Sequence, residues 1–222
     1  MSELLEHIQI DTQENPEISV IWLHGLGADG NDFVPIVKEL DLAGLPGIRF
    51  IFPHANTMPV TINNGYVMRS WYDISNADLT RREDEQGLRA SQAQVEAFIA
   101  REKARGVPAS KIVLAGFSQG CAMTIQAGLR HPEPLAGLLC LSGYAPLSAK
   151  LAAERTEASR ATPVFMAHGQ YDNVVPFSRA EASRDLLVSL GYQVEWHAYA
   201  MQHTLCLEEV QHISAWLKKV VA

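Results

Sequence analysis

The sequence predicts a single α/β domain over residues 1–222, with a mostly parallel central sheet covered by helices on both faces. Short apolar runs alternate with segments of helical periodicity from one end of the chain to the other. The apolar runs are nearly continuous, which is typical of parallel strands buried on both faces. At 222 residues, the chain is long enough to bury roughly 70% or more of its unfolded surface in one domain.

The first half of the chain contains two buried strands and two helices. Residues 18–23 and 48–52 are apolar enough for central strands, and a proline directly follows the second. Residues 31–40 form a plausible helix between them. Residues 87–105 are predicted as a helix because their apolar side chains share one stripe: Leu88, Val95, Phe98 and Ile99. Residues 4–10 are a candidate edge strand.

The second half repeats the same alternation. Its strand-like runs are residues 112–115, 135–141, 163–167 and 193–199. Its helical segments are residues 122–129, 179–190 and 207–220. A glycine follows residue 190, as expected at a helix carboxyl end. The closing helix is amphipathic, with apolar side chains at helical spacing: Leu207, Val210, Ile213, Leu217 and Val220.

One long segment, residues 53–84, lacks this regularity. It contains Pro59, the turn-forming run Asn63-Asn64-Gly65 and the aromatic residue Trp71. A loop of this length in a compact domain is usually functional. We therefore predict a substrate groove with Trp71 as a flat apolar wall; the alternative is a packed surface excursion.

A serine stands where a buried strand passes into a helix. The strand 112–115 is followed by Gly116-Phe117-Ser118-Gln119-Gly120 and then by the helix 122–129. A serine in a sharp strand-to-helix turn is the arrangement called a nucleophile elbow, and flanking glycines allow strand and helix to approach closely. Ser118 is therefore the predicted nucleophile. The alternative is a tight structural turn that merely contains serine.

A catalytic serine needs a base, and the base needs a carboxylate that fixes its tautomer. Both are expected on loops at the carboxyl ends of the strands, in the chain order serine, acid, histidine. Asp172 follows the strand 163–167, and His203 follows the strand 193–199. We predict these two as partners of Ser118; the alternative is a helix-capping aspartate and a solvated loop histidine.

Other titratable residues fit these roles less well. Several histidines and carboxylates lie within strands or helices, or near a chain end: His7, His131, His197, His212, Glu181, Asp185 and Glu195. His168 lies at the right edge of the sheet but precedes a glycine turn, so we expect it to make a structural hydrogen bond. Cys121 is a rival nucleophile, but the helix direction should turn it away from the elbow.

Acyl transfer also needs donors for a tetrahedral oxyanion. One should be the backbone N–H of Gln119, the residue after the nucleophile. The other should come from the loop His24-Gly25-Leu26-Gly27 after the first central strand, with Leu26 as the predicted donor. The Leu26 side chain could also touch the acyl group.

The same loop offers a nucleotide-binding alternative. The segment from Gly25 to Gly30 matches Gly-x-Gly-x-x-Gly between a strand and a helix. Asp29 would, however, place negative charge beside a pyrophosphate. The strand that should end in an acidic residue for the ribose ends instead in Phe52-Pro53-His54. These two features disfavour a dinucleotide site.

Composition excludes several other classes of function. The formal net charge is -7 and there is no run of lysine or arginine, which disfavours nucleic acids and anionic membranes as partners. No secretory signal is visible, and no apolar run approaches the ~18 residues of a membrane span, so no stable membrane anchor is expected.

Cys121, Cys140 and Cys206 are too scattered for a disulfide framework, and we expect buried, reduced thiols in a cytoplasmic protein. No histidines and carboxylates have ligand spacing, so no metal site is predicted.

Five motifs together resemble a known family along nearly the whole chain. They are Leu23-His24-Gly25-Leu26-Gly27, Trp71-Tyr72-Asp73-Ile74, Gly116-Phe117-Ser118-Gln119-Gly120, His168-Gly169-Gln170-Tyr171-Asp172 with Val174-Val175-Pro176, and Gln202-His203. In combination they resemble the small α/β-hydrolase family of bacterial carboxylesterases and acyl-protein thioesterases, also described as lysophospholipase-like. One departure is Met201-Gln202 before the histidine, where relatives often carry a glycine.

The resemblance implies an α/β-hydrolase fold without a cofactor. It implies a Ser118, His203 and Asp172 triad with an oxyanion hole at the Leu26 and Gln119 amides. By analogy with the family's acyl pockets, Trp71 and Val174 are candidate wall residues. Members of the family often form homodimers.

The expected activity is that of a serine carboxylesterase acting on small-molecule esters, with short to medium acyl chains and an acyl-enzyme intermediate. Short chains come first because the sequence shows neither a lipid-anchoring helix nor a large hydrophobic lid. The alternatives are an acyl-protein thioesterase or a lysophospholipase. A remote alternative is a non-catalytic ligand-binding protein on the same fold.

Overall fold

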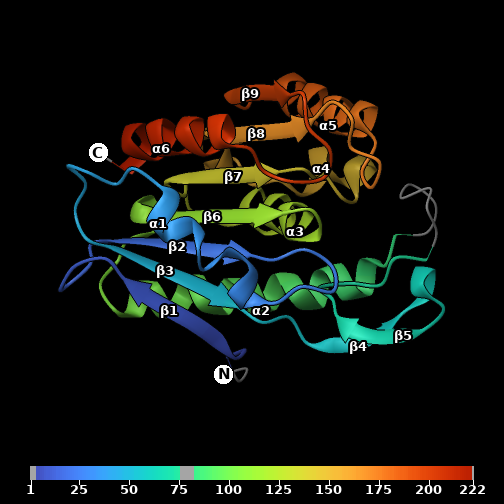
Figure 1. The fold of residues 1–222 in the computed structure, drawn as a ribbon, viewed down its shortest axis with the longest axis horizontal. Helices are drawn as coiled ribbons and strands as arrows, with labels where there is room; N and C mark the ends of the chain where they lie inside the picture. Colours follow the sequence, from blue (N-terminus) through green and yellow to red (C-terminus); the bar gives the residue numbers. More distant parts are fainter. Residues whose placement is uncertain (1–3, 76–82, 222) are drawn as a thin grey trace.

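The computed structural model describes residues 4–75 and 83–221. Its centre is a seven-stranded sheet in the order β1-β3-β2-β6-β7-β8-β9 (Figure 1). The strands are β1 (His7–Asp11), β2 (Ile18–Leu23), β3 (Ile48–Pro53), β6 (Ile112–Phe117), β7 (Gly137–Leu141), β8 (Val164–Gly169) and β9 (Val194–Tyr199). All neighbouring pairs are parallel except β1 and β3. The predicted α/β class and the N-terminal edge strand are therefore confirmed.

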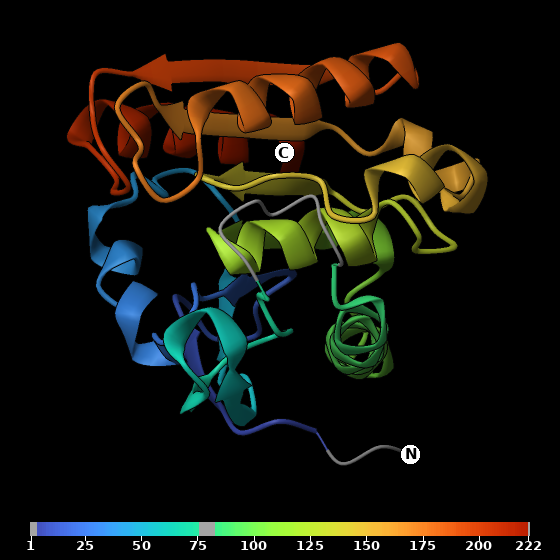
Figure 2. The same ribbon diagram turned by 90° about the vertical axis from the view of Figure 1, so that its right-hand side faces the viewer.

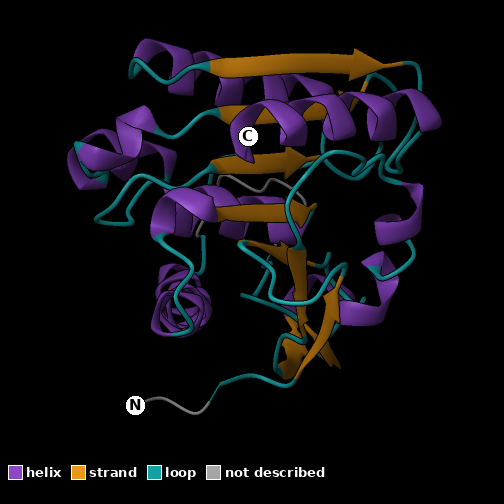
Figure 3. Cartoon of the chain, turned by 90° about the vertical axis from the view of Figure 1, so that its left-hand side faces the viewer, coloured by secondary structure: helices purple, strands orange, loops and turns teal. Residues whose placement is uncertain are grey.

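Helices cover both faces of this sheet, as Figure 2 and Figure 3 show. They are α1 (Ile36–Glu39), α2 (Glu85–Ala104), α3 (Gln119–Gly128), α4 (Ser148–Glu154), α5 (Phe177–Ser189) and α6 (Leu207–Val221). Residues of α2, α3 and α5 pack into one apolar cluster on one face. Residues of α1 and α6 pack into a second cluster on the other face.

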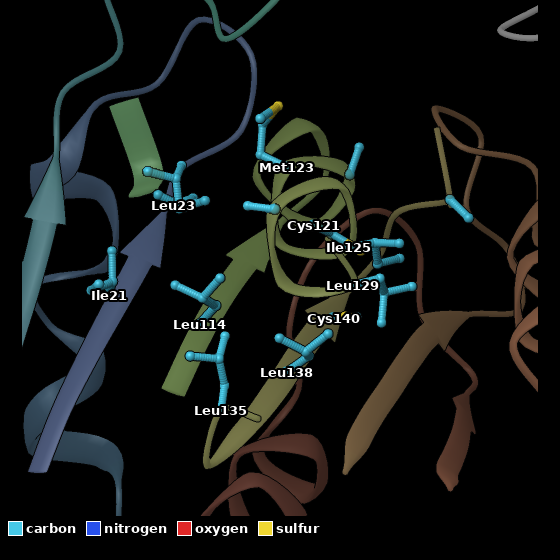
Figure 4. Packing of buried hydrophobic residues seen from close by; sticks show 14 of the residues in the cluster. Ile21, Leu23, Leu114, Cys121, Met123, Ile125, Leu129, Leu135, Leu138 and Cys140 are labelled. Atoms are coloured by element: carbon cyan, nitrogen blue, oxygen red, sulfur yellow. The ribbon is translucent and has the colours of Figure 1, made fainter. Parts of the chain in front are cut away.

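Alternation along each strand divides the apolar side chains between the two clusters. In β6, Leu114 joins the α2–α3–α5 cluster, whereas Val113 and Ala115 join the cluster of α1 and α6. Figure 4 shows Leu114 and Leu138 facing the side chains of α3. Strands that are buried in this way on both faces account for the nearly continuous apolar runs of the sequence.

The predicted helix at residues 31–40 is divided in the structure. A 3-10 turn spans Gly30–Phe33, and the short α1 begins only at Ile36. Pro35 lies between them, and proline has no N–H to continue a helical ladder. The prediction was right about helical backbone here but wrong about one regular helix.

The segment predicted as an irregular loop contains a β-hairpin. Its strands are β4 (Thr57–Val60) and β5 (Tyr66–Arg69), which pair with each other in a separate two-stranded sheet. The turn between them uses left-handed backbone at Asn64 and Gly65, with φ of 56° and 75°. Part of the predicted loop, residues 76–82, lies outside the described residues.

The hairpin is joined to the loop that follows β2. The backbone N–H of Gly27 donates to the carbonyl of Arg69 at 2.9 Å. Gly27 has a φ of 76°, a conformation that favours glycine.

Within residues 4–75 and 83–221, no helix is both long and apolar enough to cross a bilayer.

Candidate active site

Ser118 occupies the sharp turn between β6 and α3. Its backbone has φ 56° and ψ -117°, a strained conformation for a residue with a side chain. A Cβ on Gly116 would collide with the backbone of Gly120, and a Cβ on Gly120 would collide with the carbonyl of Leu23. The glycines thus let α3 pack directly against the ends of β2 and β6. The arrangement matches the predicted nucleophile elbow.

Asp172 and His203 meet at the carboxyl ends of β8 and β9. The Nδ1 of His203 lies 2.6 Å from Oδ2 of Asp172. The other carboxylate oxygen accepts backbone N–H groups from Val174 and Val175, both at 2.8 Å. This fixed carboxylate favours the His203 tautomer that carries its proton on Nδ1, which leaves Nε2 free to accept one.

The imidazole of His203 also lies next to the elbow. Its ring centroid is 4.7 Å from that of Phe117, the residue before Ser118. Among the hydrogen bonds of the described residues, none joins His203 to the Ser118 hydroxyl. Catalytic hydrogen bonds are often long in ligand-free sites and tighten when substrate binds. The structure therefore brings serine, histidine and aspartate to one edge of the sheet, with the acid–base pair already formed.

His168 supports this acid rather than replacing the base. Its Nε2 lies 2.9 Å from the carbonyl of Val175 and 3.3 Å from Oδ2 of Asp172. Burial lowers the pKa of His168, so the ring is held neutral. A structural hydrogen bond was the role predicted for this residue.

The loop after β2 lies beside Ser118. A Cβ on Gly25 would stand 3.4 Å from Cβ of Ser118, so the backbone approaches the elbow closely. His24 holds this loop: its Nε2 accepts the Ala55 N–H at 3.0 Å, and its Nδ1 lies 2.7 Å from the Gly25 carbonyl. Because Nε2 is an acceptor, Nδ1 carries the proton and donates it to Gly25.

This contact orients the peptide that carries the Leu26 N–H. In a trans peptide the carbonyl and the N–H point in opposite directions, so fixing the Gly25 carbonyl also fixes the Leu26 donor. Burial lowers the pKa of His24 to about 4, which keeps the ring neutral. His24 was expected in this loop, but this role was not predicted from the sequence.

The side chain of Gln119 has a second role that the sequence analysis missed. Its Oε1 accepts the Trp71 N–H at 2.9 Å, and its Nε2 donates to the Tyr72 carbonyl at 2.7 Å. Ser70 completes the network, with its hydroxyl 3.0 Å from Nε2 of Gln119. The residue after the nucleophile thus fastens the segment 70–72 to the elbow. A polar residue at the start of an apolar helix was the signal available in the sequence, because a polar side chain that becomes buried there needs hydrogen-bond partners.

A cavity of about 380 Å³ opens at the elbow. Its lining includes the predicted nucleophile and both predicted oxyanion residues. The full set of lining residues is Leu26, Ile62, Asn63, Tyr72, Ile74, Ser118, Gln119, Tyr144, Asn173, Val174 and Val175. The predicted contact residues Leu26 and Val174 are therefore part of its wall. The size is within the range of small-molecule sites. We call this space the Ser118 cavity.

Trp71 does not line the Ser118 cavity, contrary to the prediction that it forms a flat wall. Its side chain is buried in the core, and its indole N–H donates to the His24 carbonyl at 3.0 Å. A buried indole needs such an acceptor, and this one lies beneath the loop after β2. Trp71 thus packs behind the site, while its neighbour Tyr72 reaches the cavity.

The cysteines lie apart from this chemistry. Cys121 and Cys140 are buried in the α2–α3–α5 cluster, which matches the expectation for two of the three thiols. Cys206 is only partly buried, so the prediction of full burial is wrong there. All three are free thiols in the structure. Among the described residues, no group of three or more histidines, cysteines and carboxylates is arranged to hold a metal ion.

The parallel sheet, the serine elbow and the acid–base pair define a serine hydrolase of the esterase and thioesterase type. Comparison with known proteins narrows this class. The chain matches the family described as phospholipase/carboxylesterase over residues 5–221, and it belongs to that family.

Several relatives are similar along most of their length. Acyl-protein thioesterase 1 of Neurospora crassa is 41% identical over 208 residues, which covers 90% of this chain and 85% of the relative. A probable carboxylesterase of Oryza sativa subsp. japonica is 34% identical over 202 residues, covering 90% of this chain and 76% of the relative. The crystal structure of Arabidopsis thaliana SOBER1 has a TM-score of 0.88 at 32% identity, covering 92% of this chain and 99% of that one.

Proposed function

We propose that this chain hydrolyses acyl thioesters, and more slowly the matching oxygen esters, through Ser118, His203 and Asp172. The main support is the 2.6 Å contact between His203 and Asp172 next to the strained serine elbow. The similar acyl-protein thioesterases favour a thioester substrate over the short-chain oxygen ester that the sequence analysis placed first. We therefore reverse that order.

The proposed reaction starts when His203 takes the proton of Ser118 as the hydroxyl attacks the acyl carbonyl. Asp172 holds the imidazole and stabilises its positive charge. The amides of Leu26 and Gln119 bind the oxyanion, an effect typically worth about 3 kcal/mol per donor. His203 then protonates the departing thiolate or alkoxide, and the acyl group stays on Ser118. Finally, His203 activates a water molecule that releases the acid.

Covalent labelling tests the nucleophile. A fluorophosphonate should modify the wild-type protein at Ser118 and leave the Ser118→Ala variant unmodified. Ser189→Ala is the matched control, because Ser189 is exposed on α5 and its hydroxyl donates to the Leu186 carbonyl within the same helix. Equal labelling of the Ser118→Ala variant would show that another residue is the nucleophile.

The substrate class needs a separate measurement. We expect kcat/KM to be higher for an octanoyl thioester of N-acetylcysteamine than for ethyl octanoate, after each rate is divided by its uncatalysed rate. A His203→Ala variant should lose both activities. A preference for the oxygen ester, measured with unlabelled enzyme whose active sites were counted by labelling a separate sample, would return the assignment to a carboxylesterase.

A further inference from the structure

The Ser118 cavity has a buried polar floor. Among its lining residues, Tyr72 and Tyr144 are only 2% and 3% exposed, so they belong to its buried inner wall, which we call the floor. Ile62 and Val174 are 39% and 58% exposed and form its rim. A group that enters past the apolar rim therefore ends against two tyrosines.

The two phenol groups are hydrogen-bonded to each other, with 2.9 Å between their oxygens. Burial raises the pKa of Tyr72 and that of Tyr144, so both hydroxyls keep their protons at neutral pH. Two hydroxyls hold two protons, and one hydrogen bond between them uses only one. Within residues 4–75 and 83–221, neither hydroxyl has another recorded partner. One O–H donor is thus left over in the floor.

Each tyrosine of the floor has a further contact that helps to hold it in place. The guanidinium of Arg179 lies over the Tyr144 ring, 4.0 Å from its centroid. The carbonyl of Tyr72 accepts from Nε2 of Gln119 at 2.7 Å and from the Ser70 hydroxyl at 2.6 Å. A donor held in this way does not need to be ordered when a ligand arrives, which favours binding.

The cavity accommodates the acyl side of the substrate. It includes Ser118 and the two amide-bearing residues Leu26 and Gln119, but His203 is not among its lining residues. The leaving group departs beside His203, which gives it a proton. The part that stays on Ser118 therefore extends into the cavity toward the tyrosine floor.

We infer that the Tyr72–Tyr144 pair selects acyl groups that carry an oxygen acceptor, such as oxo or hydroxy acyl chains, over hydrocarbon chains of the same shape. This inference rests on the proposed hydrolase function and adds an acyl preference to it. The free O–H donates to the acceptor at the floor. A hydrocarbon chain of the same shape leaves that donor without a partner, and an unsatisfied buried donor lowers affinity.

The test compares p-nitrophenyl esters that differ only at the acceptor. The pairs are 4-oxopentanoate with 4-methylpentanoate and 6-oxoheptanoate with 6-methylheptanoate, in which a methyl group replaces the oxo oxygen. The ratio of kcat/KM within a pair is measured for the wild type and for the double variant Tyr72→Phe/Tyr144→Phe. Dividing the two ratios cancels the intrinsic reactivity of each ester.

We expect the oxo preference to fall about three- to tenfold in the double variant for at least one pair, the size of one neutral hydrogen bond. Tyr192→Phe is the matched control, because its buried hydroxyl bonds to Ser159 at 2.7 Å and lies outside the cavity. It should keep the wild-type ratio. Inhibition of the wild type by the free acids is a second measurement that needs no variant, and the oxo acid should bind about three- to tenfold more tightly than its methyl partner.

Equal ratios in the wild type and the double variant, together with equal inhibition by the two acids, would overturn the inference while ester hydrolysis stands. Failure of the proposed function gives a different result. In that case the wild type hydrolyses none of the four esters and Ser118 is not labelled by the fluorophosphonate.

Discussion

Glu209 offers a prediction that links pH to stability. It is the third residue of α6, and its side chain is fully buried. Burial raises the pKa of its carboxyl group to about 8, and neither carboxylate oxygen has a hydrogen-bond partner among the described residues. We expect the Glu209→Gln variant to lose a pH dependence that the wild type has.

The direction follows from proton binding. In the unfolded chain the carboxyl group releases its proton near 4.5, whereas in the folded protein it keeps the proton up to about 8. Between these values the folded state binds more protons than the unfolded state, so stability falls as the pH rises. At about 1.4 kcal/mol per pH unit, the upper limit of the loss between pH 5 and pH 8 is about 3 to 4 kcal/mol.

Urea unfolding at pH 5 and pH 8 measures this loss. The free energy of unfolding of Glu209→Gln, relative to wild type, should rise by about 1 to 4 kcal/mol between the two pH values. Glu208→Gln is the matched control, because Glu208 is an exposed neighbour on the same turn of α6. If the profiles of the wild type and Glu209→Gln are parallel, Glu209 ionises normally in the folded protein and the argument fails.

Two further predictions concern His24 and the buried ion pair at the opposite end of the sheet. His24→Ala should lower kcat about 10- to 100-fold with little change in KM, because the Leu26 donor loses its orientation, whereas His24→Asn keeps a donor and should recover part of the rate. Equal kcat in all three proteins would refute that role. Glu102 accepts from Arg49 at 2.9 Å and from Ser19 at 2.7 Å, so Glu102→Ala should cost about 1 to 3 kcal/mol in urea unfolding, because the buried Arg49 then keeps only its longer ion pair with Asp11 at 3.3 Å. Esterase activity per folded molecule should be unchanged, and an equally stable variant would contradict the prediction.

The candidate catalytic residues could be picked out because the sequence encodes their local geometry directly. Ser118 lies between an apolar strand and a helix, with glycines on both sides, and few other structures need that pattern. Asp172 and His203 follow buried strands, and parallel strands bring their carboxyl ends to one edge. The structure places both at that edge, in contact with each other.

The hairpin β4–β5 was missed for physical reasons. Its strands are four residues long and largely exposed, so they lack the alternation that marks a half-buried strand. Pro59 within β4 argued further against a strand, although proline is tolerated in an edge strand such as this one. The turn-forming residues Asn64 and Gly65 could be recognised in the sequence, but the residues on either side of them do not show the alternating pattern of a half-buried strand.

The position of Trp71 could not be predicted from its type. An aromatic residue in an irregular segment fits both a cavity wall and the core. The outcome depends on long-range partners, here the carbonyl of His24 and the side chain of Gln119. Those contacts join segments that are far apart along the chain, and periodicity carries no information about them.

The hydrogen bond from Gly27 to Arg69 has a consequence for protein engineering. It makes the hairpin a structural partner of the loop that bears the Leu26 amide. An exchange of residues 57–69 with those of a relative, made to widen acyl specificity, will also shift that amide and thereby the turnover number. Chimaeras that retain the Arg69 backbone position should separate the effect on acyl specificity from the effect on turnover. In these chimaeras the inserted turn varies, whereas the hydrogen bond from Gly27 to the Arg69 carbonyl is kept.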